Sequence, residues 1–179
     1  MKVARFVFTI ITIFLIIASI ALTSCGRHNM NFNFAEIMEG ESLYDISLTI
    51  YYASTNIFTP IEWRVEDLIR IRGDNKIIIS GSELEASLYL FKQINSDILI
   101  LARGRSPHPP LVRFYYVLES EKNGKLFDVV LWGGRNGAIF NGVEVEMHYI
   151  FYDIMIPFLP EDFAERMMRW RDELAYGSK

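Results

Sequence analysis

Apolar and polar positions divide this 179-residue chain into one continuous apolar run near its start and a patterned remainder. Residues 6–22 contain no charge, no proline and no glycine, and Lys2 and Arg5 precede them. A basic start followed by an apolar run of this kind is typical of an export signal. The pattern therefore predicts that the rest of the chain faces outside the cytosol.

Alternation with a period of two predicts most of the strands. In residues 43–53 Ile46, Leu48, Ile50 and Tyr52 fall on one face, as expected of a half-buried strand. Further on, Asn-Gly pairs at 123–124 and 141–142 each separate two alternating runs, which is the strongest local signal for a hairpin because both residues tolerate positive φ. Short apolar runs within residues 74–80 and 98–102 are expected to be buried strands.

Helical spacing appears in three later segments. The first segment, residues 60–72, starts at a proline and ends before Gly73. The second, residues 82–94, starts with the capping-box pattern of Ser82 and Glu85. The third starts at residue 160 and repeats apolar positions at spacings of three and four. Together, the segments predict an α+β fold: a mostly antiparallel sheet of about five to six strands packed against two or three helices, preceded by the hydrophobic signal helix.

Composition limits the classes of protein to which the chain can belong. Removal of residues 1–24 leaves 155 residues, enough for one domain with its own core. The whole chain carries a net charge of −4, and without Lys2 and Arg5 the charge is −6, which argues against nucleic-acid binding. Cys25 is the only cysteine, so the chain cannot form internal disulfides or a multi-cysteine metal site.

The position of that cysteine adds a more specific signal. Leu22-Thr23-Ser24-Cys25 closes the apolar run and resembles the lipobox of bacterial lipoprotein precursors. The resemblance implies that a diacylglycerol is attached to Cys25, that the signal is cut between Ser24 and Cys25, and that the protein is lipid-anchored on the outer side of a membrane. Gly26 in place of Asp implies, by the same analogy, that no inner-membrane retention signal is present. An uncleaved transmembrane anchor is the main alternative, because residues 6–22 approach the length of a spanning helix.

The expected organisation has three parts. Residues 1–24 are the signal peptide, residues 25–42 a polar tether, and residues 43–179 a single α+β domain. Phe32, Phe34 and Ile37 interrupt the tether and could dock onto the domain.

The chain carries only weak patterns for catalysis or metal binding. His28, His108 and His148 lack the spacing of a metal motif, so no metal and no cofactor are predicted. Glu144 and Glu146 would share one face of a strand and are the candidate pair for a carboxylate hydrolase acting on an envelope glycan or peptide bond. The two acids are explained more simply as the solvent-exposed face of an amphipathic strand.

A recognition surface is the remaining hypothesis. Positive charge concentrates on and beside a proline-rich loop, and two tryptophans could add aromatic surface. The candidate residues are Arg103, Arg105, His108, Arg113, Trp63 and Trp132. An ordinary solvated loop with both tryptophans in the core is the simpler interpretation. The sequence thus predicts a membrane-anchored extracytoplasmic lipoprotein whose domain is a non-enzymatic binding module for an envelope or other extracytoplasmic protein partner.

Overall fold

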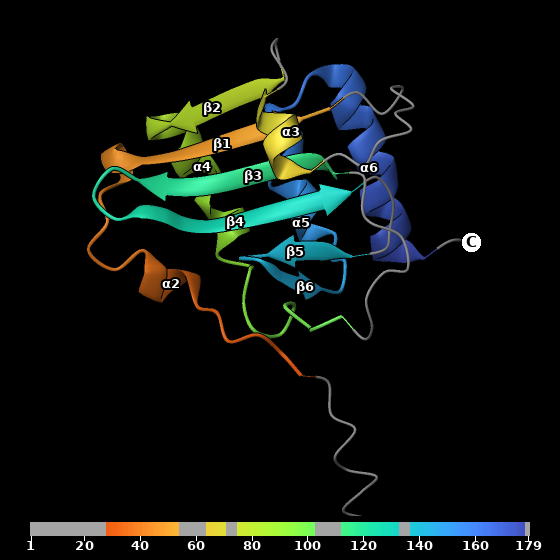
Figure 1. Cartoon of the computed structure of the whole chain (residues 1–179), viewed down its shortest axis with the longest axis horizontal. Helices are drawn as coiled ribbons and strands as arrows, with labels where there is room; N and C mark the ends of the chain where they lie inside the picture. The colour runs from red at the N-terminus through yellow and green to blue at the C-terminus, as the bar shows by residue number, and fades with distance from the viewer. Residues whose placement is uncertain (1–27, 54–63, 71–74, 103–111, 133–136, 178–179) are drawn as a thin grey trace, which may run out of the picture.

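The computed structural model describes residues 28–53, 64–70, 75–102, 112–132 and 137–177. Within these ranges the chain forms an α+β fold on one six-stranded antiparallel sheet, which confirms the predicted class (Figure 1). In spatial order the sheet reads β2-β1-β3-β4-β5-β6. The strands are β1 (Ile46–Tyr52), β2 (Lys76–Ser80), β3 (Val112–Ser120), β4 (Gly124–Trp132), β5 (Ala138–Phe140) and β6 (Val143–Val145).

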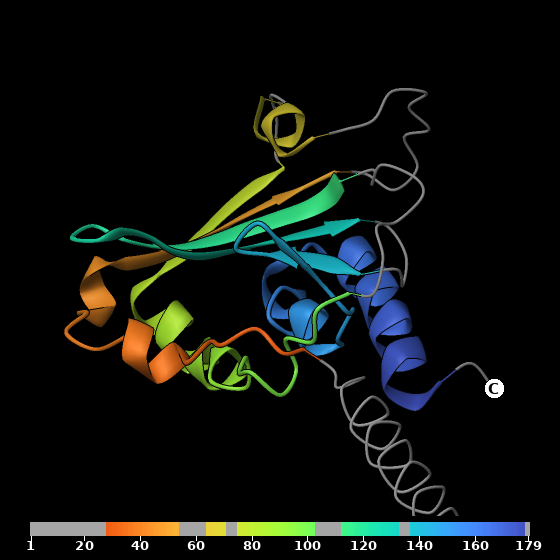
Figure 2. The ribbon, with the colours of Figure 1, turned by 60° about the horizontal axis from the view of Figure 1, so that its bottom comes forward.

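Helices pack unequally on the two faces of the sheet. Figure 2 shows α2, α4, α5 and α6 on one face and α3 alone on the other. The described helices are α2 (Phe34–Ile37), α3 (Val65–Arg70), α4 (Gly81–Phe91), α5 (Ile150–Asp153) and α6 (Glu161–Tyr176), with short 3-10 turns η1 (Leu43–Asp45) and η2 (Ile156–Phe158). We call the face that carries α3 the outer face and the opposite one the inner face.

The main core lies between the inner face and the larger group of helices. The side chains of Ile46, Leu48, Ile50 and Tyr52 all belong to it, as the alternation in β1 predicts. An aromatic cluster centres on Phe127, whose ring centroid lies 5.5 Å from that of Phe140, with three further rings within 6.3 Å. Those three are Phe32, Phe34 and Phe91.

Both predicted hairpins form. Strands β3 and β4 join through a turn before Gly124, which has a φ of +71°, and β5 and β6 join through Asn141 and Gly142. The φ values of that second pair are +48° and +78°, as a two-residue turn of the primed type requires.

Residues 28–42, which belong to the predicted tether, pack against the domain. Phe32 and Phe34 are buried in the main core, so the apolar residues of this segment do dock. Ladder-like bridges join Asn29 to Ile100 and Asn33 to Asn95. The Glu41 carboxylate then accepts hydrogen bonds from the tip of the β3–β4 hairpin. Residues 25–27 lie outside the described ranges, as does the expected signal segment.

The expected strand at residues 98–102 appears only as single bridges. Ile100 pairs with Asn29 on one side, and Leu101 pairs with Val145 of β6 on the other. This segment therefore extends the sheet past β6 to residues 28–30 without forming a regular strand.

One helix start differs from its prediction. The capping box at Ser82 is wrong: α4 has Ser80 at its N-cap, without a side-chain cap hydrogen bond. Gly81 explains this start, because its φ of +60° turns the chain from β2 into α4 without a loop. Of the helix predicted over residues 60–72, the described part is α3, while α6 begins at Glu161 as expected.

Candidate functional site

The outer face is the part of the sheet that the described helices leave most open. Leu68 of α3 packs near one end of it, in a small apolar cluster with Ala53, Val112 and Val130. Strand register then places the other outward side chains in rows across β2, β1, β3 and β4. They are Ser47, Thr49, Tyr51, Lys76, Ile78, Ser80, Tyr115, Val117, Glu119, Lys125 and Asp128.

A cation and two aromatic rings form one row. Lys76, Tyr51 and Tyr115 are directly opposite one another on neighbouring strands. The Lys76 ammonium lies 5.5 Å from the centre of the Tyr51 ring, and the two tyrosine rings stack with centroids 5.8 Å apart and an interplanar angle of 24°. Stacked rings beneath a cation present a flat surface that is partly apolar and partly charged.

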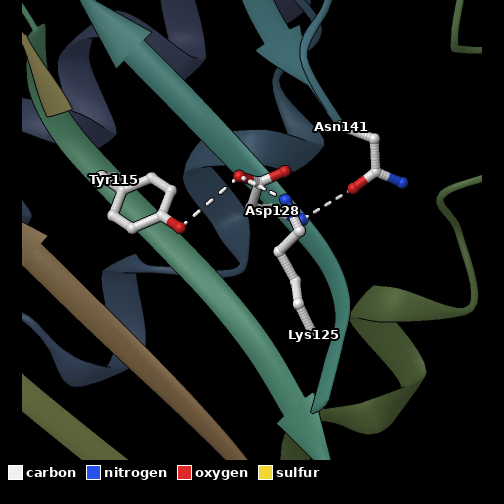
Figure 3. A network of polar contacts seen from close by, with 4 residues as sticks. All are labelled: Tyr115, Lys125, Asp128 and Asn141. Atoms are coloured by element: carbon white, nitrogen blue, oxygen red, sulfur yellow. Dashed lines mark hydrogen bonds and ion pairs between the residues drawn. The ribbon is translucent and has the colours of Figure 1, made fainter. Parts of the chain in front are cut away.

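A carboxylate lies diagonally across from Tyr115 on β4, because Asp128 is directly opposite Val117 (Figure 3). One Asp128 oxygen, Oδ2, accepts a hydrogen bond of 3.4 Å from the Tyr115 hydroxyl and is 3.2 Å from the Lys125 ammonium. The Asn141 side-chain oxygen accepts from the Asp128 backbone N–H at 2.9 Å. The turn between β5 and β6 thus fixes the backbone that carries this carboxylate.

The other oxygen of Asp128, Oδ1, is buried and accepts no hydrogen bond from the described residues. Partial burial and the nearby carboxylate also raise the pKa of the Tyr115 phenol, because both disfavour its ionised form. Tyr115 therefore stays protonated and donates its hydrogen bond. Because Asp128 Oδ1 is enclosed, the groups that this part of the outer face presents to a partner are the stacked rings and the Lys76 ammonium.

The β2 side of the outer face ends at a strand edge. Ile78 lies there with 60% of its surface exposed. Tyr52 N–H donates to the Asn75 carbonyl. In an antiparallel pair every second residue is hydrogen-bonded to the neighbouring strand, so the N–H and C=O groups of Ile77 and Ile79 also point toward β1. Ile78, which alternates with them, directs its N–H and C=O away from β1, where no described residue pairs with them. Within the described part of the chain, this edge therefore offers both a large apolar side chain and unpaired strand backbone.

Of the predicted recognition residues, the structure describes only Arg113 and Trp132. Trp63, Arg103, Arg105 and His108 lie outside the described ranges, as do Ser24 and Cys25. Arg113 and Trp132 are both buried at the end of the β3–β4 pair, and Arg113 occupies a bulge. Burial lowers the pKa of the Arg113 guanidinium.

The predicted carboxylate pair is placed in and beside β6. Glu144 pairs with Ile139 on the outer face, while Glu146 follows the strand and donates its backbone N–H to the Ile100 carbonyl. Both are half-buried. In the described part of the chain, no group of three or more His, Cys, Asp or Glu residues is positioned to hold a metal ion.

Sequence reasoning missed the outer face as a candidate surface. The alternation of β1 assigns Ser47, Thr49 and Tyr51 to the side opposite the core. It does not reveal that β3 lies next to β1, which is what stacks Tyr51 on Tyr115.

Comparison with protein-family models, curated proteins and solved structures gives no match for this chain. Within the described ranges, no helix has the length and apolar character needed to cross a membrane.

Proposed function

We propose that this chain is the precursor of an extracytoplasmic lipoprotein, anchored to a membrane through Cys25, whose domain binds another envelope protein without catalysis. The observation that carries the binding part is the outer face, where stacked tyrosines and a lysine adjoin a strand edge that no described residue pairs. Aromatic residues and free strand edges are recurrent elements of protein recognition.

The anchoring part rests on the first 25 residues. Lys2 and Arg5, the apolar run and the resemblance of residues 22–25 to a lipobox occur in the order that lipoprotein export requires. Several buried acyl chains would hold the domain at the membrane, because each buried methylene contributes about 0.8 kcal/mol.

Metabolic labelling with a clickable fatty acid tests the anchor. We expect the full-length protein to incorporate the label and Cys25→Ala to lose it, with Cys25→Ser as a size-matched control that also lacks a thiol. Intact-mass measurement separates the alternatives: an unmodified thiol on a chain that retains residues 1–24 would support an uncleaved membrane anchor and contradict lipidation.

Site-specific photo-crosslinking tests the binding surface in intact cells. A photoreactive residue at Ile78 should give a discrete adduct with an envelope protein. Tyr89 on α4 is the matched control, because it is 62% exposed against 60% for Ile78 but lies on the helical side of the sheet. Adducts from both positions in equal yield, or from neither, would contradict binding through the outer face.

If adducts form at Ile78, substitutions within the face locate the contact more finely. Tyr115→Phe keeps the ring stacked on Tyr51 and removes only the hydroxyl that donates to Asp128. Asp128→Asn keeps the size of the side chain and removes its charge. We expect both to reduce the adduct yield while the thermal unfolding midpoint stays near that of the wild type, since each removes a partly exposed polar contact.

A further inference from the structure

The docked N-terminal segment fixes the point from which the chain leads back to Cys25. Met30 N–H donates to the Leu99 carbonyl at 2.8 Å, and Leu101 N–H donates to the His28 carbonyl at 2.9 Å. These bonds, with the bridge between Asn29 and Ile100, hold His28 beside residues 99–101, which in turn pair with β6 through Leu101 and Val145. We call residues 28–30, residues 99–102 and β6 the anchored edge.

Only Gly26 and Arg27 separate Cys25 from His28. Three residue steps span at most about 11 Å when fully extended. The lipid-bearing residue therefore cannot lie farther than this from His28 while the segment stays docked. The sequence alone predicts a tether of up to 18 residues over 25–42, which would allow the domain to move freely above the membrane.

We infer that the mature domain rests with its anchored edge against the lipid headgroups, in a fixed orientation rather than on a flexible tether. This inference rests on the proposed lipid at Cys25. The occupant of the surface is the bilayer itself, because the covalent link and its short reach bring this edge to the headgroups. Buried Phe32 and Phe34 keep the segment on the domain.

The orientation also determines what faces away from the membrane. From the anchored edge the sheet continues through β5, β4, β3 and β1 to β2, which lies at the far side of the sheet in Figure 1. Five strand spacings separate β6 from β2, or roughly 24 Å along the sheet. Ile78 and the free edge of β2 would therefore point away from the lipid surface, where an envelope partner can reach them.

Short-range fluorescence quenching by nitroxide-headgroup lipids tests this orientation on the lipidated protein in liposomes. With Cys25 acylated, an introduced cysteine is the only free thiol, so single labels can be attached at Val143→Cys on β6 and at Ser80→Cys on β2. Both positions are exposed, and Ser80 makes no side-chain cap bond. We expect quenching at position 143 to exceed that at position 80 by roughly threefold or more, because the two strands are five spacings apart.

A linker variant supplies the matched control. Insertion of a Gly/Ser segment of about 20 residues between Arg27 and His28 leaves the domain unchanged but allows a root-mean-square reach of roughly 25 Å. The ratio of quenching between the two labels should then approach one.

The outcomes separate the inference from the proposed function. Acylated Cys25 with unequal quenching that the linker abolishes supports the inference. Acylated Cys25 with equal quenching at both labels overturns the inference and leaves the lipid anchor intact. An unmodified Cys25 thiol in the purified protein overturns the anchor and the inference with it.

Discussion

At the scale of single residues, Glu41 couples the N-terminal segment to the β3–β4 hairpin. Its carboxylate accepts hydrogen bonds from the Ser120 hydroxyl and the Asn123 amide, and these bonds lower the pKa of Glu41 below its ordinary value of 4.5. For a carboxyl group whose pKa is lowered on folding, the stabilisation is present above the ordinary pKa and is lost as the pH falls through the lowered one.

We therefore expect Glu41→Gln to lower the thermal unfolding midpoint near neutral pH, and the difference from the wild type to shrink as the pH falls through the lowered pKa. Thermal unfolding followed by circular dichroism across this pH range measures the difference. Glu39→Gln is the control, because Glu39 is an exposed acid in the same segment. A difference that stays constant with pH would show that the Glu41 charge is not involved.

His148 provides a second pH-dependent contact, at the start of α5. Its Nδ1 accepts the Ile150 N–H at 3.3 Å, which requires an unprotonated Nδ1. Burial lowers the pKa of His148 below its ordinary value of 6.5, although Asp153 acts in the opposite direction. The neutral ring therefore stabilises the fold above pH 6.5, and this stabilisation is lost as the pH falls through the lowered pKa.

Replacing His148 with Asn keeps an acceptor near the Nδ1 position and removes the titrating group. We expect the free energy of unfolding of His148→Asn to fall less steeply than that of the wild type as the pH decreases below 6.5. Urea titrations at several pH values give this slope, and the NMR titration of the His148 ring gives its pKa directly. An equal slope in both proteins would assign the pH dependence to other groups.

At the scale of elements, the Asn141-Gly142 turn links local sequence to the candidate surface. Gly142 has a φ of +78°, and no atom lies within 4 Å of the position that an added methyl group would occupy, so the cost of Gly142→Ala comes from the backbone alone. We expect a loss of about 1 kcal/mol in the free energy of unfolding. Denaturant unfolding checks this value.

Asn141→Gly is the matched variant for the same turn. Glycine tolerates the φ of +48° at this position, but the variant lacks the oxygen that accepts the Asp128 N–H. We expect faster hydrogen exchange at the Asp128 amide in Asn141→Gly and little local change there in Gly142→Ala. Equal exchange in both variants would contradict the role of Asn141 in holding the Asp128 backbone.

The elements that the sequence predicts well are those determined by neighbours along the chain. Both Asn-Gly hairpins and α6 are local features, because turn residues and helical spacing lie within a few positions of each other. The irregular pairing of residues 98–102 is not local, since its partners are residues 28–30 and β6. For the same reason the stacking of Tyr51 on Tyr115 could not be predicted before the strand order was known.

At the scale of the whole molecule, the largest difference from the sequence prediction is the role of residues 28–42. Their polar composition favours a tether, yet Phe34 stacks near Phe91 with centroids 5.9 Å apart, and Glu41 reaches Ser120, 79 positions along the chain. Contacts across such separations leave no periodic signal in the sequence. If Cys25 carries the proposed lipid, these contacts predict an oriented domain rather than a freely moving one.

Phe34→Ala tests whether this segment is an integral part of the fold. Phe34 is 3% exposed, and truncating a buried phenylalanine typically costs about 3–5 kcal/mol. Tyr44→Ala, at a site 90% exposed, should change the stability by less than about 0.5 kcal/mol. Because the Phe34 ring joins the core formed by the sheet, α4 and α6, we expect the Phe34 variant to unfold at lower denaturant concentration in a single transition. If residues 28–42 were a tether, both variants would unfold like the wild type, and proteases would cut the segment while the domain remained folded.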